Sequence, residues 1–368
     1  MSTAIIGAGA SGLACAIKLK MLKPSEDVTV FERLKEPGRK ILATGNGRCN
    51  LTNVEAENFK EVTEFFNSIG VVLREEEGRI YPYSLKATTV RNALVGAAKE
   101  LGVNIVTDCN VEKVCKGFTL YTSEGNFNAE NVVVATGGMA QSALGSNGSG
   151  YEILKSFGHK IVTPCPALVQ LTTNKGYLSY LKGTRTRATV TIKLDGETVA
   201  SETGEVLFTG YGISGIAVMD LSQAVSQNFA KSNPCRCTAH IDLTPEFSEA
   251  DLARHIENFG NLNGILGDTI SGIILKQAGG DKQKCPQIAK NYRLIVTGTK
   301  GFDFAQITAG GVSMNEVNNF KSCKVSNLYI TGEVLDRQFK CGGFNLDFAW
   351  HSGITAAKEI AGKTHDQN

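Results

Sequence analysis

The stretch that decides the fold is residues 3–32, T-A-I-I-G-A-G-A-S-G-L-A-C-A-I-K-L-K-M-L-K-P-S-E-D-V-T-V-F-E. Residues 3–7 are a short apolar run typical of a buried strand. Residues 8–20 repeat apolar side chains at helical spacing, and residues 28–31 are a second apolar run. This order of strand, turn, helix and strand predicts a parallel, right-handed βαβ unit.

The turn of this unit carries the pattern G-x-G-x-x-G at residues 7–12. The first glycine permits a tight turn, the second lets backbone approach a pyrophosphate, and the third lets the helix pack on the sheet. Glu32 ends the second strand, where a carboxylate accepts hydrogen bonds from ribose hydroxyls and disfavours a 2′-phosphate. The pattern therefore predicts a site for NAD or FAD rather than NADP. Its expected residues are Gly7, Gly9, Ala10, Ser11, Gly12, Glu32 and Arg33.

Two later apolar runs also end in glycine. Residues 132–138 read V-V-V-A-T-G-G, and residues 328–336 read L-Y-I-T-G-E-V-L-D, with Glu333 directly after Gly332. In two-dinucleotide-domain flavoproteins, a strand ending in Gly-Asp or Gly-Glu near the C-terminus meets FAD, and the next helix N-terminus faces the flavin ring. Here C-G-G-F-N at 341–345 precedes a predicted helix over 347–361, so the pattern favours FAD over NAD.

Short motifs along nearly the whole chain resemble one bacterial family. They lie at 38–40, 44–53 (T-G-N-G-R-C-N-L-T-N), 78–82, 135–138, 166–169, 207–215, 307–312, 332–336 and 342–345. In this order they resemble the FAD-dependent, NAD(P)-linked flavoproteins of the BaiN-like and aminoacetone oxidase type. The block G-R-C-N-L-T-N is more distinctive than G-x-G-x-x-G. At Cys341, Phe344, Gly210 and Ile216 the chain differs from the residues that the family usually has. These positions are expected on the substrate side of the site, so the differences bear on the choice of substrate and not on FAD binding.

The resemblance implies an α/β fold with a discontinuous, Rossmann-like FAD-binding domain. That domain would comprise residues 1–155 and 300–368, with an inserted β-barrel at 156–246 and a small helical subdomain at 247–299. The sequence pattern agrees, because short alternating segments follow residue 155 and helical spacing covers residues 247–278.

Basic and glycine-rich segments extend the predicted cofactor site. Arg39, Lys40 and Arg48 stand among glycines and would contact FAD phosphates or the flavin edge, although a solvated basic loop is the alternative. The other residues expected to bind the cofactor are Cys49, Asn50, Val111, Ala135, Thr136, Gly137, Gly332, Glu333, Gly342, Gly343, Phe344 and Asn345.

No catalytic group stands out by type and spacing. Phe344, Asn345, His351 and Cys341 are weak candidates by their place near the closing helix, and Tyr81 and Tyr83 could supply a proton or simply pack. A redox disulfide between Cys49 and Cys341 is disfavoured because no C-x-x-C motif accompanies them.

Two further patterns have plain structural interpretations. Residues 210–215 form a second G-x-G-x-x-G, but no acid ends a strand twenty residues later, so we interpret it as a turn rather than an NAD(P)H site. Cys235, Cys237 and His240 supply three metal-ligand types but lack a second half, so we expect a strand with buried thiols and no metal.

Composition describes an ordinary folded protein. The chain has 368 residues, 38 Lys+Arg against 36 Asp+Glu, and ten scattered cysteines. A net charge of +2 gives no strong attraction to nucleic acid or membrane. Scattered cysteines suit a reducing compartment, and no apolar run approaches ~18 residues, so we expect a cytoplasmic protein. The oligomeric state stays open.

The reaction predicted is hydride transfer between NAD(P)H and an electron-poor C=C of a small molecule, such as an enone or pyrimidine, through FAD. Three alternatives stay open: an amine oxidase using O2, a ribosomal RNA uridine reductase, and a non-catalytic FAD-binding redox sensor. The RNA alternative rests on a cluster that a solvated barrel loop would also explain. Its residues are Lys182, Arg185, Arg187, Tyr177 and Tyr180.

Overall fold

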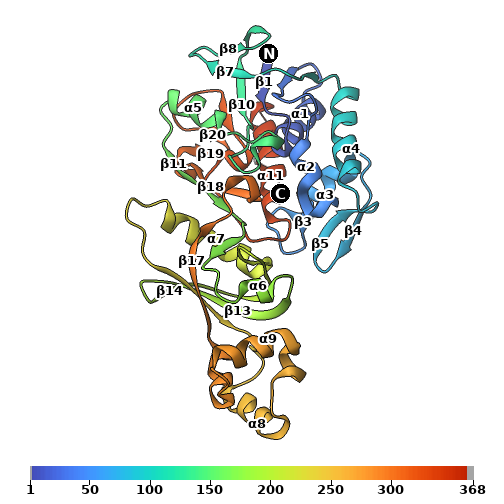
Figure 1. Cartoon of the computed structure of the whole chain (residues 1–368). Coiled ribbons are helices and arrows are strands. Elements are labelled where there is room, and N and C mark those ends of the chain that lie inside the picture. Colours follow the sequence, from blue (N-terminus) through green and yellow to red (C-terminus); the bar gives the residue numbers. More distant parts are fainter. Residues whose placement is uncertain (1, 363–368) are drawn as a thin grey trace. The chain divides into compact units, whose positions relative to one another are not determined.

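The computed structural model describes residues 2–362. Contacts divide the chain into two units, drawn as ribbons in Figure 1. Unit 1 comprises Met1–Pro164 and Ile307–Asn368, and unit 2 comprises Cys165–Gln306. Each unit has its own apolar core. Within residues 2–362, no helix has the length and apolar character needed to cross a membrane.

Unit 1 contains a seven-stranded sheet that is parallel except at one edge. The strands lie in the order β19 (Val317–Asn318), β20 (Lys321–Ser322), β21 (Leu328–Ile330), β10 (Asn131–Val134), β1 (Ser2–Ile6), β2 (Asp27–Phe31), β6 (Asn104–Val106). Ile5 of β1 faces Val133 of β10 and Val30 of β2, all in parallel register. The predicted βαβ unit is therefore confirmed, with β1 and β2 adjacent and α1 between them in the chain.

Helices and small sheets surround this sheet. The helices of unit 1 are α1 (Ala10–Leu22), α2 (Arg39–Ala43), α3 (Phe59–Ser68), α4 (Ala87–Glu100), α5 (Ser149–Ser156) and α11 (Phe344–Ile360). The small sheets join β3 (Thr52–Asn53), β5 (Arg79–Pro82) and β4 (Leu73–Glu76); β7 (Val111–Val114), β8 (Thr119–Thr122) and β9 (Gly125–Asn128); and β11 (Ile161–Ala167) with β18 (Ile307–Val312).

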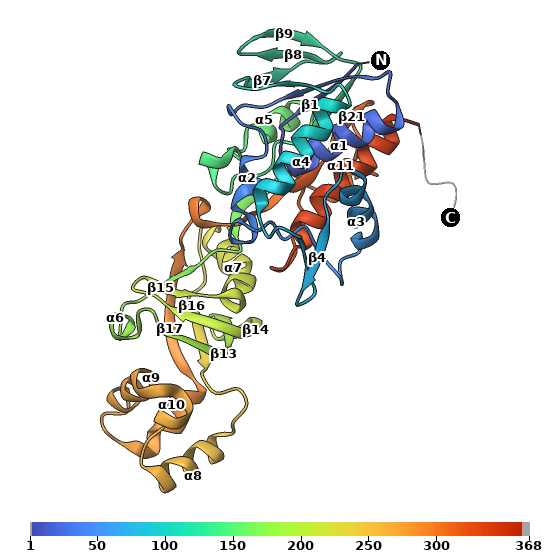
Figure 2. The same ribbon diagram turned by 90° about the vertical axis from the view of Figure 1, so that its right-hand side faces the viewer.

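A glycine contact sets the packing of α1 against α11. Figure 2 shows α1 and α11 side by side in unit 1. A Cβ on Gly353 of α11 would lie 2.1 Å from the carbonyl oxygen of Ser11, so only glycine permits this approach. The C-terminal helix is thereby held against the N-terminal βαβ unit.

Unit 2 contains a closed antiparallel barrel and five helices. The barrel order is β12 (Leu171–Thr173), β15 (Gly212–Ser214), β14 (Glu197–Phe208), β13 (Arg185–Leu194), β16 (Cys237–Asp242), β17 (Tyr292–Thr299). The helices are α6 (Leu178–Leu181), α7 (Ile216–Phe229), α8 (Glu249–Phe259), α9 (Asn263–Gln277) and α10 (Cys285–Lys290). Alternate barrel residues such as Val190 and Ile192 are fully buried, as the period of a strand requires.

The predicted fold class is confirmed, whereas element boundaries differ in detail. The predicted helical stretch 247–278 is two helices, because Ser248 and Asp251 form a capping box that starts α8 and Gly260 ends it in a left-handed conformation. β17 is a barrel strand, although it falls inside segment 247–299, which was predicted as a helical subdomain. The predicted boundary after residue 155 falls inside α5. The assignment of these segments as separate domains stays a prediction.

Candidate functional site

The three glycines of the first turn have different surroundings. A Cβ on Gly7, whose φ is +105°, would lie 2.5 Å from the Ala135 carbonyl oxygen, and one on Gly12 would lie 2.0 Å from the Gly7 carbonyl oxygen. A Cβ on Gly9 would meet nothing within 4 Å. The first and third glycines therefore let protein segments pack together, while the second faces open space.

The N-terminus of α1 presents backbone donors at this open position. The first amide bonded within the helix is that of Leu13, which donates to the Gly9 carbonyl, and no side chain caps α1. The amides of Ala10, Ser11 and Gly12 thus have no partner within the helix. Uncapped amides with the helix dipole behind them suit an anionic phosphate.

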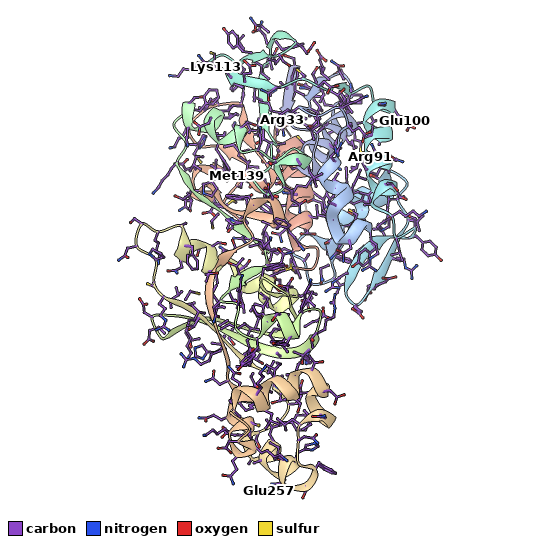
Figure 3. The ribbon with its side chains drawn as sticks, in the orientation of Figure 1. Arg33, Arg91, Glu100, Lys113, Met139 and Glu257 are labelled. Atoms are coloured by element: carbon purple, nitrogen blue, oxygen red, sulfur yellow. The ribbon has the colours of Figure 1, made fainter. Side chains whose placement is uncertain are left out.

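Glu32 is fixed beside this turn by backbone amides. One carboxylate oxygen accepts from the Ala8 amide and the other from the Leu34 amide, each at 2.9 Å. Each oxygen keeps lone pairs for further donors, as a ribose hydroxyl requires. The neighbouring Arg33, labelled in Figure 3, donates to the carbonyls of Ser142 and Gly145, and its Nε is buried without a partner.

The ends of β10 and β21 also reach the start of α1. The contact between Gly7 and Ala135 joins the ends of β1 and β10. A Cβ on Gly332 would lie 2.5 Å from the Ser11 hydroxyl oxygen, which places the end of β21 at the first turn of α1. The Gly332 amide donates to the Ser352 hydroxyl of α11 at 2.9 Å. This hydrogen bond of a predicted cofactor residue links the end of β21 to α11.

A polar network joins α2, β18 and the segment after β10. Lys40 Nζ lies 2.8 Å from Glu333 Oε2, and the other Glu333 oxygen accepts from the Thr308 amide. The Thr308 hydroxyl accepts from the amides of Met139 and Ala140. Lys40 and Glu333, both predicted as cofactor residues, are thus brought together, and Thr308 is a participant that we did not predict.

The distinctive block at 47–53 docks on the beginning of α11. The Asn53 amide group donates to the Gly342 carbonyl at 3.1 Å, and Trp350 Nε1 donates to the Leu51 carbonyl at 3.1 Å. A Cβ on Gly343 would lie 2.6 Å from the Thr52 carbonyl oxygen. The block therefore serves to position the loop and helix that the sequence predicts beside the flavin.

A buried carboxylate strengthens this junction. Asp347, 3% exposed, accepts from the Thr52 hydroxyl at 2.5 Å and from the Asn58 side chain at 2.9 Å. Burial raises the pKa of Asp347, against the lowering effect of these hydrogen bonds. Asp347, Thr52, Asn53 and Asn58 were not predicted individually. The only sequence signal was the block that contains two of them.

The side chains of the first turn of α11 are largely engaged. Asn345 accepts from the Phe339 amide and donates to the carbonyls of Phe339 and Lys340, so it closes the preceding loop. Lys340 Nζ lies 5.0 Å from the centre of the Phe344 ring. No side chain caps α11 at Gly343, so its first backbone amides remain as donors.

His351 lies away from that N-terminus. It is seven residues after Phe344, about 10 Å along the helix. Its Nδ1 donates to Glu61 of α3 at 2.6 Å, and Lys358 donates to the other Glu61 oxygen. These partners link α3 to α11, and the catalytic role considered for His351 stays a prediction.

The other residues predicted to bind the cofactor have separate surroundings within unit 1. Arg48 lies 3.3 Å from Glu76 and stacks over the Tyr81 ring, while Arg39 is exposed. Cys49 is buried, which raises the pKa of its thiol to about 12. Val111 is buried in the core. Gly137 packs against Ser146, and Thr136 against Gly150. Cys49 and Cys341 form no disulfide.

The remaining motifs have structural explanations in unit 2. Gly212 and Gly215 lie where a Cβ would meet the carbonyl oxygens of Leu171 and Glu205, and β15 pairs antiparallel on both sides. The second G-x-G-x-x-G is therefore a barrel turn. Cys237 is buried, while His240 bonds Asn291 at 2.8 Å.

The polar-aromatic cluster considered for RNA is divided by ion pairs. Arg185 pairs with Glu205 and Arg187 with Glu246. Tyr177 and Tyr180 remain together, with Lys276 Nζ 5.6 and 4.8 Å from their ring centres. Both ion pairs are exposed to solvent, where such pairs are weak, so the RNA alternative stays a prediction.

The residues of unit 1 fit an extended dinucleotide. Gly9 leaves an open cradle, Glu32 and Glu333 supply carboxylates, and the Asn50 Oδ1 and Thr331 Oγ1 atoms are buried without partners. Gly353, which contacts Ser11 at the start of α1, lies ten residues after Gly343. About 15 Å of α11 therefore separates the N-terminus of α11 from its contact with the N-terminus of α1.

A parallel sheet whose strand ends gather at such helix N-termini is typical of Rossmann-like FAD-dependent oxidoreductases, and this chain is one of them. A family model described as the HI0933-like protein Rossmann domain matches residues 1–62 and 58–359, and the chain belongs to this family. The resemblance inferred from the motifs is thereby confirmed.

Individual relatives cover nearly the whole chain. A 3-dehydro-bile acid delta(4,6)-reductase from Clostridium scindens is 33% identical over 97% of this chain and 98% of its own. A ribosomal RNA dihydrouridine synthase from Haemophilus influenzae is 29% identical over 97% and 98%. Among solved structures, 3-ketosteroid delta1-dehydrogenase from Sterolibacterium denitrificans superposes with a TM-score of 0.54 at 11% identity, covering 98% and 99%, and shares the fold.

Proposed function

We propose that the protein reduces an electron-poor C=C of a small molecule, with NAD(P)H as the electron donor and FAD as the carrier. The observation that carries this proposal is the uncapped N-terminus of α11, held in place by Thr52, Asn53 and Asp347. The bile acid reductase supports an enone as substrate, because it is the relative with 33% identity.

FAD, when bound, supplies hydride acceptance from a reduced nicotinamide and hydride delivery to a substrate carbon. The amides of Ala10, Ser11 and Gly12 would bind its pyrophosphate, with Gly9 leaving room for it. Glu32 would accept from the adenosine ribose. The first amides of α11 would favour negative charge at the flavin edge, because the helix dipole is positive there.

Anaerobic reduction of the purified holoprotein tests this proposal. We expect NADH or NADPH to bleach the flavin absorbance, and a 3-dehydro-bile acid with double bonds at positions 4 and 6 to restore it. The saturated product should appear with one nicotinamide oxidised per double bond reduced. A variant Gly9→Val is the control, because it should purify without yellow colour.

Other outcomes would each replace the proposal. Bleaching by a primary amine and reoxidation by O2 would establish an oxidase. Dihydrouridine in ribosomal RNA after incubation with NADPH would establish an RNA reductase. A flavin that no donor reduces would indicate a redox sensor. We also propose a cytoplasmic location, which fractionation of the source cells would test.

A further inference from the structure

One buried tyrosine hydroxyl in unit 1 lacks any hydrogen-bond partner. Tyr151 is 4% exposed, and its hydroxyl oxygen is buried with no hydrogen-bond partner. A buried hydroxyl normally has a partner, because water has been removed from it. An orphaned one therefore needs an explanation, such as a ligand that completes its hydrogen bonds.

Tyr151 stands among three segments of the cofactor site. It lies in the first turn of α5, where a Cβ on Gly150 would meet the Thr136 hydroxyl oxygen at 2.0 Å. A Cβ on Gly148 would lie 3.0 Å from Met139, labelled in Figure 3. The start of α5 thus packs directly on the segment that follows β10.

The third segment is the end of β21. Burial raises the pKa of the Tyr151 hydroxyl, and the negative charges of Glu333 and Asp336 raise it further. A Cβ on Gly138 would meet Glu333 Oε1 at 2.8 Å, so the segments after β10 and β21 touch at this carboxylate. The hydroxyl stays protonated in such surroundings and is a hydrogen-bond donor.

We propose that the Tyr151 hydroxyl binds FAD by donating a hydrogen bond to an acceptor atom of the bound cofactor between the ends of β10 and β21. This inference rests on the FAD site of the proposed function and is independent of which substrate is reduced. It adds a side chain outside the glycine motifs to the groups that hold the cofactor.

The variant Tyr151→Phe removes only the hydroxyl. Apoprotein melting should stay equal or rise, because the unpartnered polar group is gone. The FAD dissociation constant, measured by quenching of flavin fluorescence, should rise by about 3- to 10-fold, the worth of one hydrogen bond. The stabilisation that FAD gives to melting should fall correspondingly.

Tyr329→Phe is the matched control, because Tyr329 is equally buried in β21 and its pKa is raised by burial and by Glu359 and Cys15 rather than by Glu333. Its FAD dissociation constant should match the wild type. An unchanged constant for Tyr151→Phe would overturn the inference, and so would a lower apoprotein melting temperature, since the hydroxyl would then have a partner without FAD. Wild-type titration reports separately whether FAD binds at all.

Discussion

At the scale of single residues, what each glycine contacts separates packing from ligand binding. Gly12 has the Gly7 carbonyl 2.0 Å from its Cβ position, whereas Gly9 has free space. Both belong to one motif, so the sequence pattern assigns them to one function. Substitution should distinguish them.

Gly9→Val should leave the apoprotein folded and abolish FAD binding. The Cβ of the new side chain would meet no protein atom within 4 Å, so the free energy of unfolding should change by no more than about 1 kcal/mol, the cost of losing glycine at the N-cap. Gly12→Val should instead destabilise the fold by about 3 kcal/mol or more, because its Cβ overlaps backbone. Urea unfolding and FAD titration measure both effects. A folded Gly9→Val protein with full FAD occupancy would contradict the assignment.

Asp347 is a second residue whose partners define its role. Asp347→Ala leaves the Thr52 hydroxyl and the Asn58 amides without their acceptor, and Thr52 is fully buried. We expect a loss of about 3 kcal/mol in urea unfolding, since each buried unsatisfied group costs about 1–3 kcal/mol. FAD affinity should fall as well, because the start of α11 loses its anchor.

Asp251→Ala is the control for Asp347, because Asp251 also occupies the first turn of a helix but is solvent-exposed in unit 2. Its loss of stability should be smaller, and FAD affinity should not change. Equal effects of the two substitutions on FAD affinity would argue against Asp347 as an anchor of the site.

At the scale of elements, one carboxylate holds α3 against α11. Burial works to raise the pKa of Glu61, but hydrogen bonds from His351 and Lys358 outweigh it and lower the pKa from 4.5 to about 2. The folded pKa is below the unfolded one. The stabilisation is therefore fully present above pH 4.5 and is lost as the pH falls toward 2.

Glu61→Gln should remove this pH-dependent contribution. The variant should be less stable than the wild type at pH 7, by up to about 3 kcal/mol, and the difference should shrink as the pH falls from 4.5 toward 2. Urea unfolding at pH 7 and pH 3 gives both values. Glu64→Gln, on the exposed face of α3, is the control and should change little. A difference in unfolding free energy between Glu61→Gln and the wild type that does not change with pH would refute this role of the Glu61 carboxylate.

At the scale of the whole molecule, two separate cores have different relations to the cofactor. The core of unit 1 includes Leu13, Val133 and Trp350, and that of unit 2 includes Val190 and Ile274. The residues predicted to bind FAD lie in two parts of the sequence, from Gly7 to Gly137 and from Gly332 to Asn345. Both parts belong to unit 1. A ligand stabilises what it binds, so the two units should respond differently to FAD.

Calorimetry should therefore resolve two unfolding transitions, of which only one depends on FAD. At FAD concentrations 100 times the dissociation constant, the transition of unit 1 should gain about 2.7 kcal/mol. The transition of unit 2 should keep its midpoint. A single transition that shifts as a whole would mean that the two cores unfold cooperatively, against the predicted domain division.

The sequence predicted the parts that depend on neighbouring residues. The βαβ unit follows from strand and helix periods within residues 3–32, and the turn at Gly7 needs the positive φ that glycine adopts most readily. The start of α8 was missed by two residues, because helix periodicity does not locate the Ser248 cap.

The sequence alone determined the fold class, the glycine turn after β1 and the family, because these depend on local spacing and on short motifs. Only the tertiary structure decided which predicted side chains are already engaged. Asn345 closes its own loop, Arg48 pairs with Glu76 and His351 pairs with Glu61. The last of these pairs joins residues 290 positions apart. Such pairing depends on how distant segments pack, which no local pattern encodes.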